Sequence, residues 1–106
     1  MEITAGNAAQ VIEEADRSVS NCPKALLPYF VKSRALLYLG RAEEALATSR
    51  KVLEMDPGSY LAYAELGMTY AAMGKNDKAI EMYQAALRIK PDFSVARENL
   101  KRLRGF

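Results

Sequence analysis

The chain has 106 residues, of which 50% are hydrophobic and 26% charged, and its formal net charge is +2. This size favours one domain with one core, and so small a net charge argues against a nucleic-acid partner. No apolar run approaches the roughly 18 residues that cross a bilayer, and the N-terminus lacks the pattern of a signal peptide, so we expect no membrane insertion. A single cysteine, Cys22, rules out a disulfide within the chain and favours a reducing, cytoplasmic setting.

The first predicted helix lies within residues 1–25. Asn7 and Gln10 form a plausible capping pair at its start, and the helix is expected to continue to about Val19. Its apolar residues recur at spacings of three and four, which indicates a single buried face. That face consists of Ala8, Val11, Ile12, Ala15 and Val19.

Two further helices are predicted in the part of the chain that follows. The first is expected over residues 26–39 and ends at Gly40, because glycine readily adopts the left-handed conformation that terminates a helix. The second is expected over residues 43–55 and ends before the proline of an Asp-Pro-Gly turn.

The next 34 residues repeat this arrangement. Ser59 is a suitable N-cap for a helix that continues to about Met73, and Gly74 then ends it. Asn76 is expected to cap the following helix, which ends near Ile89 because a residue before proline is disfavoured in the α conformation.

Asp92 is placed to cap a last helix within residues 94–106. We expect its apolar residues to face the protein and its basic residues to face solvent, as in the polar end cap of a repeat protein. The inward residues are Ala96, Leu100 and Leu103, and the outward residues are Arg97, Lys101, Arg102 and Arg104. The basic stretch lacks interleaved aromatic residues, so we interpret it as a solvated face rather than as a site for an acidic partner.

Two kinds of turn-forming residue share a period of 34 along the chain. Prolines fall at Pro23, Pro57 and Pro91, and glycines at Gly6, Gly40 and Gly74. A shared period of this length indicates internal repeats, each made of two antiparallel helices. The chain is therefore predicted to contain six helices and no strands.

Within residues 26–93 the chain resembles the tetratricopeptide repeat, a 34-residue helix–turn–helix unit with the pattern W-x2-L-G-x2-Y…A-x3-F…P. The matching residues are Tyr63, Leu66, Gly67, Tyr70, Ala79, Tyr83 and Pro91. The preceding repeat departs from this pattern, because Lys32 stands in place of leucine and Ser33 in place of glycine. We expect its two helices to pack less tightly.

The resemblance implies an all-α fold, a right-handed solenoid of antiparallel helix pairs with about six helices. Residues 26–59 and 60–93 would be its two repeats, and residues 94–106 would form a C-terminal capping helix. Residues 1–25 would be either the second helix of an incomplete N-terminal repeat, as in a fragment of a longer array, or a natural N-terminal cap.

Nothing in the sequence indicates catalysis. The chain has no histidine, which removes the commonest general base and the commonest zinc ligand, and leaves Cys22 without a partner for nucleophilic catalysis. Its paired glutamates are neighbours on predicted helices and point in different directions. We therefore expect no enzyme activity, no metal and no cofactor.

The resemblance also implies where a partner would bind. In this family the first helices of successive repeats line a concave groove that holds a peptide, and a partner-binding groove is expected here on one face of each first helix. The groove residues so predicted are Leu27, Phe30, Val31, Arg34, Tyr38, Leu61, Glu65, Met68, Asn99 and Arg102, with Ala64, Ala72 and Val95 beside them. The alternative is that the apolar members only pack beneath neighbouring helices.

One subclass of the family is disfavoured by the residues themselves. Members that bind chaperone tails hold a C-terminal carboxylate with lysines, asparagines and an arginine. The matching positions here are Phe30, Arg34, Glu65, Val95 and Asn99. None carries the expected type of residue, and Glu65 would repel a carboxylate.

The sequence thus predicts a non-enzymatic module that binds a peptide or partner protein, within a larger protein or assembly. Two alternatives stay open. Copies could self-associate through exposed terminal helices as a structural scaffold, or the module could regulate an enzyme located elsewhere in a longer chain.

Overall fold

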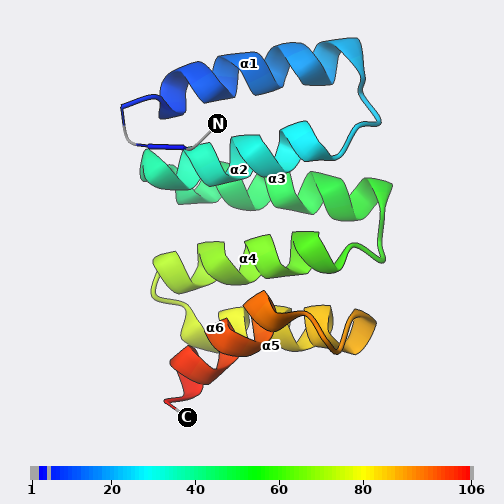
Figure 1. Ribbon diagram of the computed structural model, residues 1–106. Coiled ribbons are helices and arrows are strands. Elements are labelled where there is room, and N and C mark those ends of the chain that lie inside the picture. The colour runs from blue at the N-terminus through cyan, green and yellow to red at the C-terminus, as the bar shows by residue number, and fades with distance from the viewer. Residues whose placement is uncertain (1–2, 5, 106) are drawn as a thin grey trace.

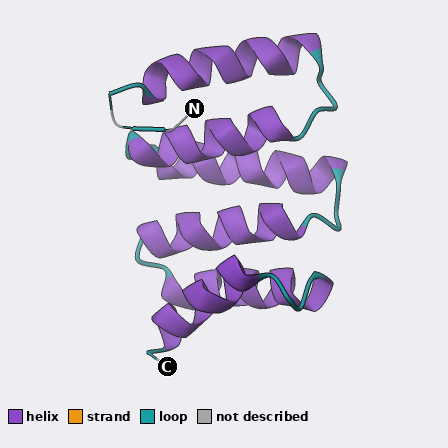
Figure 2. Ribbon diagram, viewed as in Figure 1, coloured by secondary structure: helices purple, strands orange, loops and turns teal. Residues whose placement is uncertain are grey.

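A computed structural model describes residues 3–4 and 6–105 of the chain. Within these residues it contains six helices and no strand (Figures 1 and 2), as the sequence predicted. The helices are α1 (Ala8–Asn21), α2 (Leu27–Tyr38), α3 (Ala42–Met55), α4 (Tyr60–Ala72), α5 (Asn76–Ile89) and α6 (Ser94–Arg104). None of the described helices is both long and apolar enough to cross a membrane.

The helices form an elongated solenoid that measures 40 × 28 × 22 Å. Each helix packs against the next and runs in the opposite direction, with α1 at one end of the stack and α6 at the other (Figure 1). In addition, α2 contacts α4 directly. The first helices of the two repeats therefore lie side by side, and this contact positions the candidate site.

The glycines at the ends of α2 and α4 terminate those helices as predicted. Gly40 and Gly74 have φ of 76° and 77°, in the left-handed region. After α4, the Lys75 amide donates to the Tyr70 carbonyl at 2.9 Å and the Gly74 amide to the Ala71 carbonyl at 3.0 Å. This pattern satisfies carbonyls that the helix end would otherwise leave unpaired.

Three of the four predicted capping side chains do not act as expected. Ser59 caps α4, since its hydroxyl accepts from the Ala62 amide at 3.2 Å. Asn7 is the N-cap residue of α1, but its side-chain oxygen accepts from the preceding Thr4 amide at 2.7 Å instead of from the first turn.

The predictions for Asn76 and Asp92 were wrong, because the N-cap residues of α5 and α6 are Lys75 and Phe93. The α4 turn runs directly into α5, so the Lys75 carbonyl already accepts the first helical bond. At α6, the Phe93 ring packs edge-on against Tyr60 with centroids 4.9 Å apart, which fixes the entry of the chain.

The α4–α5 interface depends on one close approach. A Cβ at Gly67 would lie 2.8 Å from a ring carbon of Tyr83, and Tyr83 is almost fully buried. Glycine is therefore the residue that lets the tyrosine ring lie across α4, and both residues match the repeat pattern.

The corresponding α2–α3 interface is closed by hydroxyl groups. Ser33 and Ser49, each 34 positions before the Gly67–Tyr83 pair, are fully buried with their hydroxyls 2.9 Å apart. Ser33 also reaches the Ala45 carbonyl at 3.3 Å. Lys32, the other departure from the pattern, pairs with Asp16 of α1 at 2.7 Å. Buried hydrogen bonds thus join α2 and α3 at the positions where Lys32 and Ser33 led us to expect looser packing.

Both terminal helices bury the faces that were predicted. In α1, Ala8, Val11 and Ala15 are buried toward α2. In α6, Ala96 is buried and the basic residues of the last turn are exposed.

Candidate functional site

An open hollow of about 280 Å³ lies where α2 faces α4. Its walls are mainly aliphatic and aromatic, with one guanidinium and one carboxylate. It brings together six of the predicted groove residues, which are Leu27, Phe30, Val31, Arg34, Leu61 and Glu65. The seventh lining residue, Ile3, comes from the N-terminal segment.

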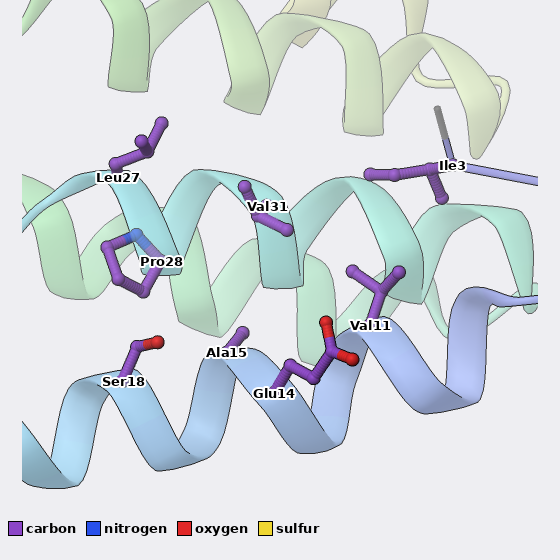
Figure 3. Close-up of a pocket in the computed structure, with 8 residues that line it drawn as sticks. All are labelled: Ile3, Val11, Glu14, Ala15, Ser18, Leu27, Pro28 and Val31. Atoms are coloured by element: carbon purple, nitrogen blue, oxygen red, sulfur yellow. The ribbon is translucent and has the colours of Figure 1, made fainter. Parts of the chain in front are cut away.

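Two more hollows adjoin this one. The first, of about 300 Å³, lies between α1 and α2 (Figure 3) and shares Ile3, Leu27 and Val31 with it. The second, of about 320 Å³, lies at the loop before α4 and shares Leu27, Phe30 and Leu61. Leu27 lines all three. We call these three hollows together the Leu27 trough.

Exposed aliphatic side chains mark the trough. Leu27 is 71% exposed, more than any other large hydrophobic residue that the structure describes, and Leu61 is 45% exposed. Both occupy the same position of successive repeats, and Val95 is their exposed counterpart on α6. An aliphatic side chain left in water at the centre of an apolar depression favours the binding of something that covers it.

Arg34 and Glu65 form an ion pair inside the trough, in which Arg34 Nη2 donates to Glu65 Oε1. The Arg34 side chain is half-exposed, whereas that of Glu65 is 9% exposed. The second oxygen, Glu65 Oε2, is buried without a hydrogen-bond partner among the described residues. Burial raises the pKa of Glu65, and the charge and hydrogen bond of Arg34 oppose this shift.

Glu65 was placed on one helix face with Leu61 and Met68 as part of an open groove, but its side chain is buried. Residues on one face of a helix share a direction, but α4 is an interior helix and α2 covers part of that face. Glu65 is beneath the covered part, whereas Leu61 remains exposed.

The other predicted groove residues lie outside the three hollows. Met68 is adjacent, with its sulfur 3.9 Å from Arg34 Nη2. Tyr38 is exposed at the far end of α2. Asn99 and Arg102 are on α6, where Arg102 donates to the Asn99 side chain at 3.3 Å.

Asn99 also has a partner within the core. Burial raises the pKa of Tyr83 to about 12, and a hydrogen bond between its phenol and Asn99 opposes this shift. The polar end of Asn99 is thus engaged with the repeat interface.

The predicted groove did not include the other eleven lining residues of the trough, among them Ile3, Glu14 and Asp56. Ile3 reaches in from the N-terminal segment, and Figure 3 shows its side chain extending along α2 toward Val31. Glu14 comes from α1 and Asp56 from the loop before α4. All three lie outside the first helices, so a search confined to those helices could not find them.

The chemistry of the trough is suited to binding. Its floor is apolar, and its charged groups lie beside that floor on several elements. Among residues 3–4 and 6–105, no group of three or more His, Cys, Asp or Glu side chains is placed to hold a metal ion. Apolar hollows with a few oriented polar groups are typical of ligand sites.

A family model described as "Tetratricopeptide repeat" matches residues 36–103. Sperm-associated antigen 1 of Mus musculus is 30% identical over 95 residues, which is 90% of this chain and 10% of that protein. The chain spans between 9% and 16% of the lengths of the first three curated relatives it matches.

Solved structures share the fold. YrrB is described as a TPR protein with an unusual peptide-binding site. Its structure aligns with 91% of this chain and with 50% of the YrrB chain, with a TM-score of 0.82 and 29% sequence identity. The second TPR domain of human RPAP3, solved with the HSP70 peptide SGPTIEEVD, matches 93% of this chain and 82% of its own. Its TM-score is also 0.82, and at 21% identity the likeness shows the fold alone.

Proposed function

The chain belongs to the tetratricopeptide repeat family, and from this premise we propose that it is a non-enzymatic module that binds a peptide or partner protein at the Leu27 trough. The observation that carries the proposal is the 71% exposure of Leu27 where three hollows meet. YrrB and the RPAP3 domain, which have the same fold, are described with a peptide-binding site and with a bound peptide.

The proposed binding mode needs little rearrangement. The aliphatic floor comes from α2 and α4, which are packed directly against each other. A ligand would cover Leu27 and Leu61 with its own apolar groups, and the helices would keep their positions. The affinity would come chiefly from apolar contact with these two side chains.

The self-associating scaffold considered from the sequence lacks comparable support. The apolar stripe of α1 is already covered by α2, and the last turn of α6 presents basic side chains to solvent. Neither end of the described solenoid offers a set of exposed apolar side chains like that of the trough.

A peptide selection tests the proposal. Peptides that bind the wild-type protein would be selected from a random display library. Their affinities for the wild type and for the double variant Leu27→Ser, Leu61→Ser would then be compared. We expect at least about tenfold weaker binding, since each substitution removes an apolar contact of about 1 kcal/mol or more. Arg34 is not changed, because it neutralises the buried Glu65.

The chain offers a matched control. Met55 and Ile89 are also exposed, are also 34 residues apart, and line none of the three hollows. The double variant Met55→Ser, Ile89→Ser should bind the selected peptides as the wild type does. Equal losses in the two double variants would show that the trough is not the binding surface.

A further inference from the structure

The charges of the Leu27 trough indicate what kind of peptide it would hold, an inference that rests on the proposed function. Each of the three hollows contains one carboxylate, from Glu14, Glu65 and Asp56 respectively. The three residues come from α1, α4 and the loop between α3 and α4, and each lines a hollow that Leu27 also lines. Arg34 is the single cation among the described lining residues.

That cation is already engaged. Arg34 donates to Glu65, and no ion pair joins Glu14 or Asp56 to another residue of the described chain. Asp56 accepts one hydrogen bond, from the Gly58 amide at 3.3 Å. The trough therefore presents an uncompensated negative charge around an apolar floor, and a ligand of opposite charge would be attracted to it.

Glu65 adds a buried carboxylate to the charges of the trough. Its side chain is nine-tenths buried and lines the central hollow, and its Oε2 has no partner among the described residues. A buried carboxylate oxygen without a hydrogen bond is destabilising. This oxygen is closed to solvent, so Glu65 acts on a ligand through its charge: a ligand cation nearby would lower the cost, and a ligand carboxylate would increase it.

The chain itself shows what fits the apolar part. Ile3 belongs to a non-helical segment, and its side chain lies in two of the three hollows, against α2 (Figure 3). An aliphatic side chain on a non-helical segment can therefore occupy this floor.

We propose that the Leu27 trough binds a basic, apolar peptide segment, with aliphatic side chains over Leu27 and Leu61 and lysine or arginine side chains beside Glu14, Asp56 and Glu65. The long alkyl stems of lysine and arginine can cover apolar surface while their charged ends reach the carboxylates. An acidic peptide would meet three carboxylates.

The test compares two pools of short synthetic peptides that carry leucine or isoleucine at the same positions. One pool has lysine and arginine at the remaining positions, and the other has aspartate and glutamate. Fluorescence anisotropy at low and at physiological salt should show the basic pool binding at least about tenfold more tightly, with the difference decreasing as salt rises.

Neutral variants locate the source of the preference. Glu14→Gln with Asp56→Asn removes two trough carboxylates, keeps their shapes and leaves an oxygen to accept the Gly58 amide. We expect it to reduce the preference for the basic pool at least about threefold. The control, Glu13→Gln with Glu81→Gln, removes two exposed carboxylates outside the trough and should leave the preference unchanged.

The remaining outcomes overturn the inference in distinguishable ways. Tighter binding of the acidic pool, lost on Leu27→Ser, would refute the charge preference and leave the proposed function standing. Binding of neither pool would count against both. An equal loss of preference in the control would show that net charge, and not the trough, attracts the peptide.

Discussion

At the scale of single residues, one glycine position carries much of the packing of the second repeat. The space that a Gly67 side chain would need is taken by the ring of Tyr83. The small residue Gly67 therefore serves the contact between α4 and α5. Gly67 and Tyr83 both match the repeat pattern, so the pattern identified the two residues that meet.

Substitution of Gly67 should therefore destabilise the protein. Gly67→Leu is expected to lower the free energy of unfolding by about 1–3 kcal/mol through overpacking against Tyr83. Gly58→Ala is a suitable control, since the nearest atom to its new Cβ would be 3.8 Å away. Urea unfolding measures both, and an unchanged midpoint for Gly67→Leu would refute the close approach.

The burial of Glu65 has a consequence for pH dependence. Because burial raises its pKa above the ordinary value of 4.5, the folded protein retains this proton at pH values where the unfolded chain has released it. The contribution of this group to stability is therefore fully present below pH 4.5 and is lost as pH rises through the raised pKa.

Glu65→Gln should remove that dependence. The variant is expected to gain stability relative to the wild type as pH rises from about 4 to 7, because glutamine carries no charge to desolvate. Urea unfolding of both proteins across this range measures the difference. A difference that stayed constant, or that favoured the wild type increasingly toward pH 7, would contradict the raised pKa.

At the scale of helices, the two repeats use different residue pairs at the same position of the contact between their two helices. The Gly67–Tyr83 pair of the second repeat corresponds to Ser33 and Ser49 of the first. Sequence reasoning identified Ser33 as a departure from the pattern but did not predict its partner. Two serines on different helices can hydrogen-bond only if their hydroxyls come within about 3 Å of each other, and this depends on the packing of α2 on α3.

We expect the glycine–tyrosine pair to replace the serine pair only if both residues are exchanged together. Ser49→Tyr alone is expected to cost about 1–3 kcal/mol, since the new ring would overlap the side chain of Ser33. Ser33→Gly should relieve that clash, with a favourable coupling of about 0.5–3 kcal/mol in a double-mutant cycle measured by urea unfolding. Additive effects of the two substitutions would show that the pairs are not equivalent.

The helix starts provide a second comparison between elements. Ser59 caps α4 with its side chain, whereas Asn76 is the first residue of α5 and makes no cap bond. Ser59→Ala should cost about 1 kcal/mol and Asn76→Ala much less. Thermal unfolding of the two variants would test this order, and a larger loss for Asn76→Ala would contradict the observed cap positions.

At the scale of the whole molecule, the 34-residue period with its turn and capping residues predicted six helices in the right order. The resemblance to the repeat family predicted six residues that line the central hollow. It could not predict that Ile3, Glu14 and Asp56 complete the trough. Those residues belong to the N-terminal segment, α1 and a loop, and their approach to Leu27 depends on how separate elements pack. The repeat pattern carries no information about these contacts.

The central claim is that the Leu27 trough is the binding surface, and amide NMR tests it most directly. During titration with a peptide from the basic pool, the amide signals of Leu27, Leu61 and Glu14 should shift in a saturable way. The signals of Met55 and Ile89, on the second helices of the repeats, should stay in place. Saturable shifts confined to α3 and α5, with Leu27 and Leu61 unchanged, would contradict the account.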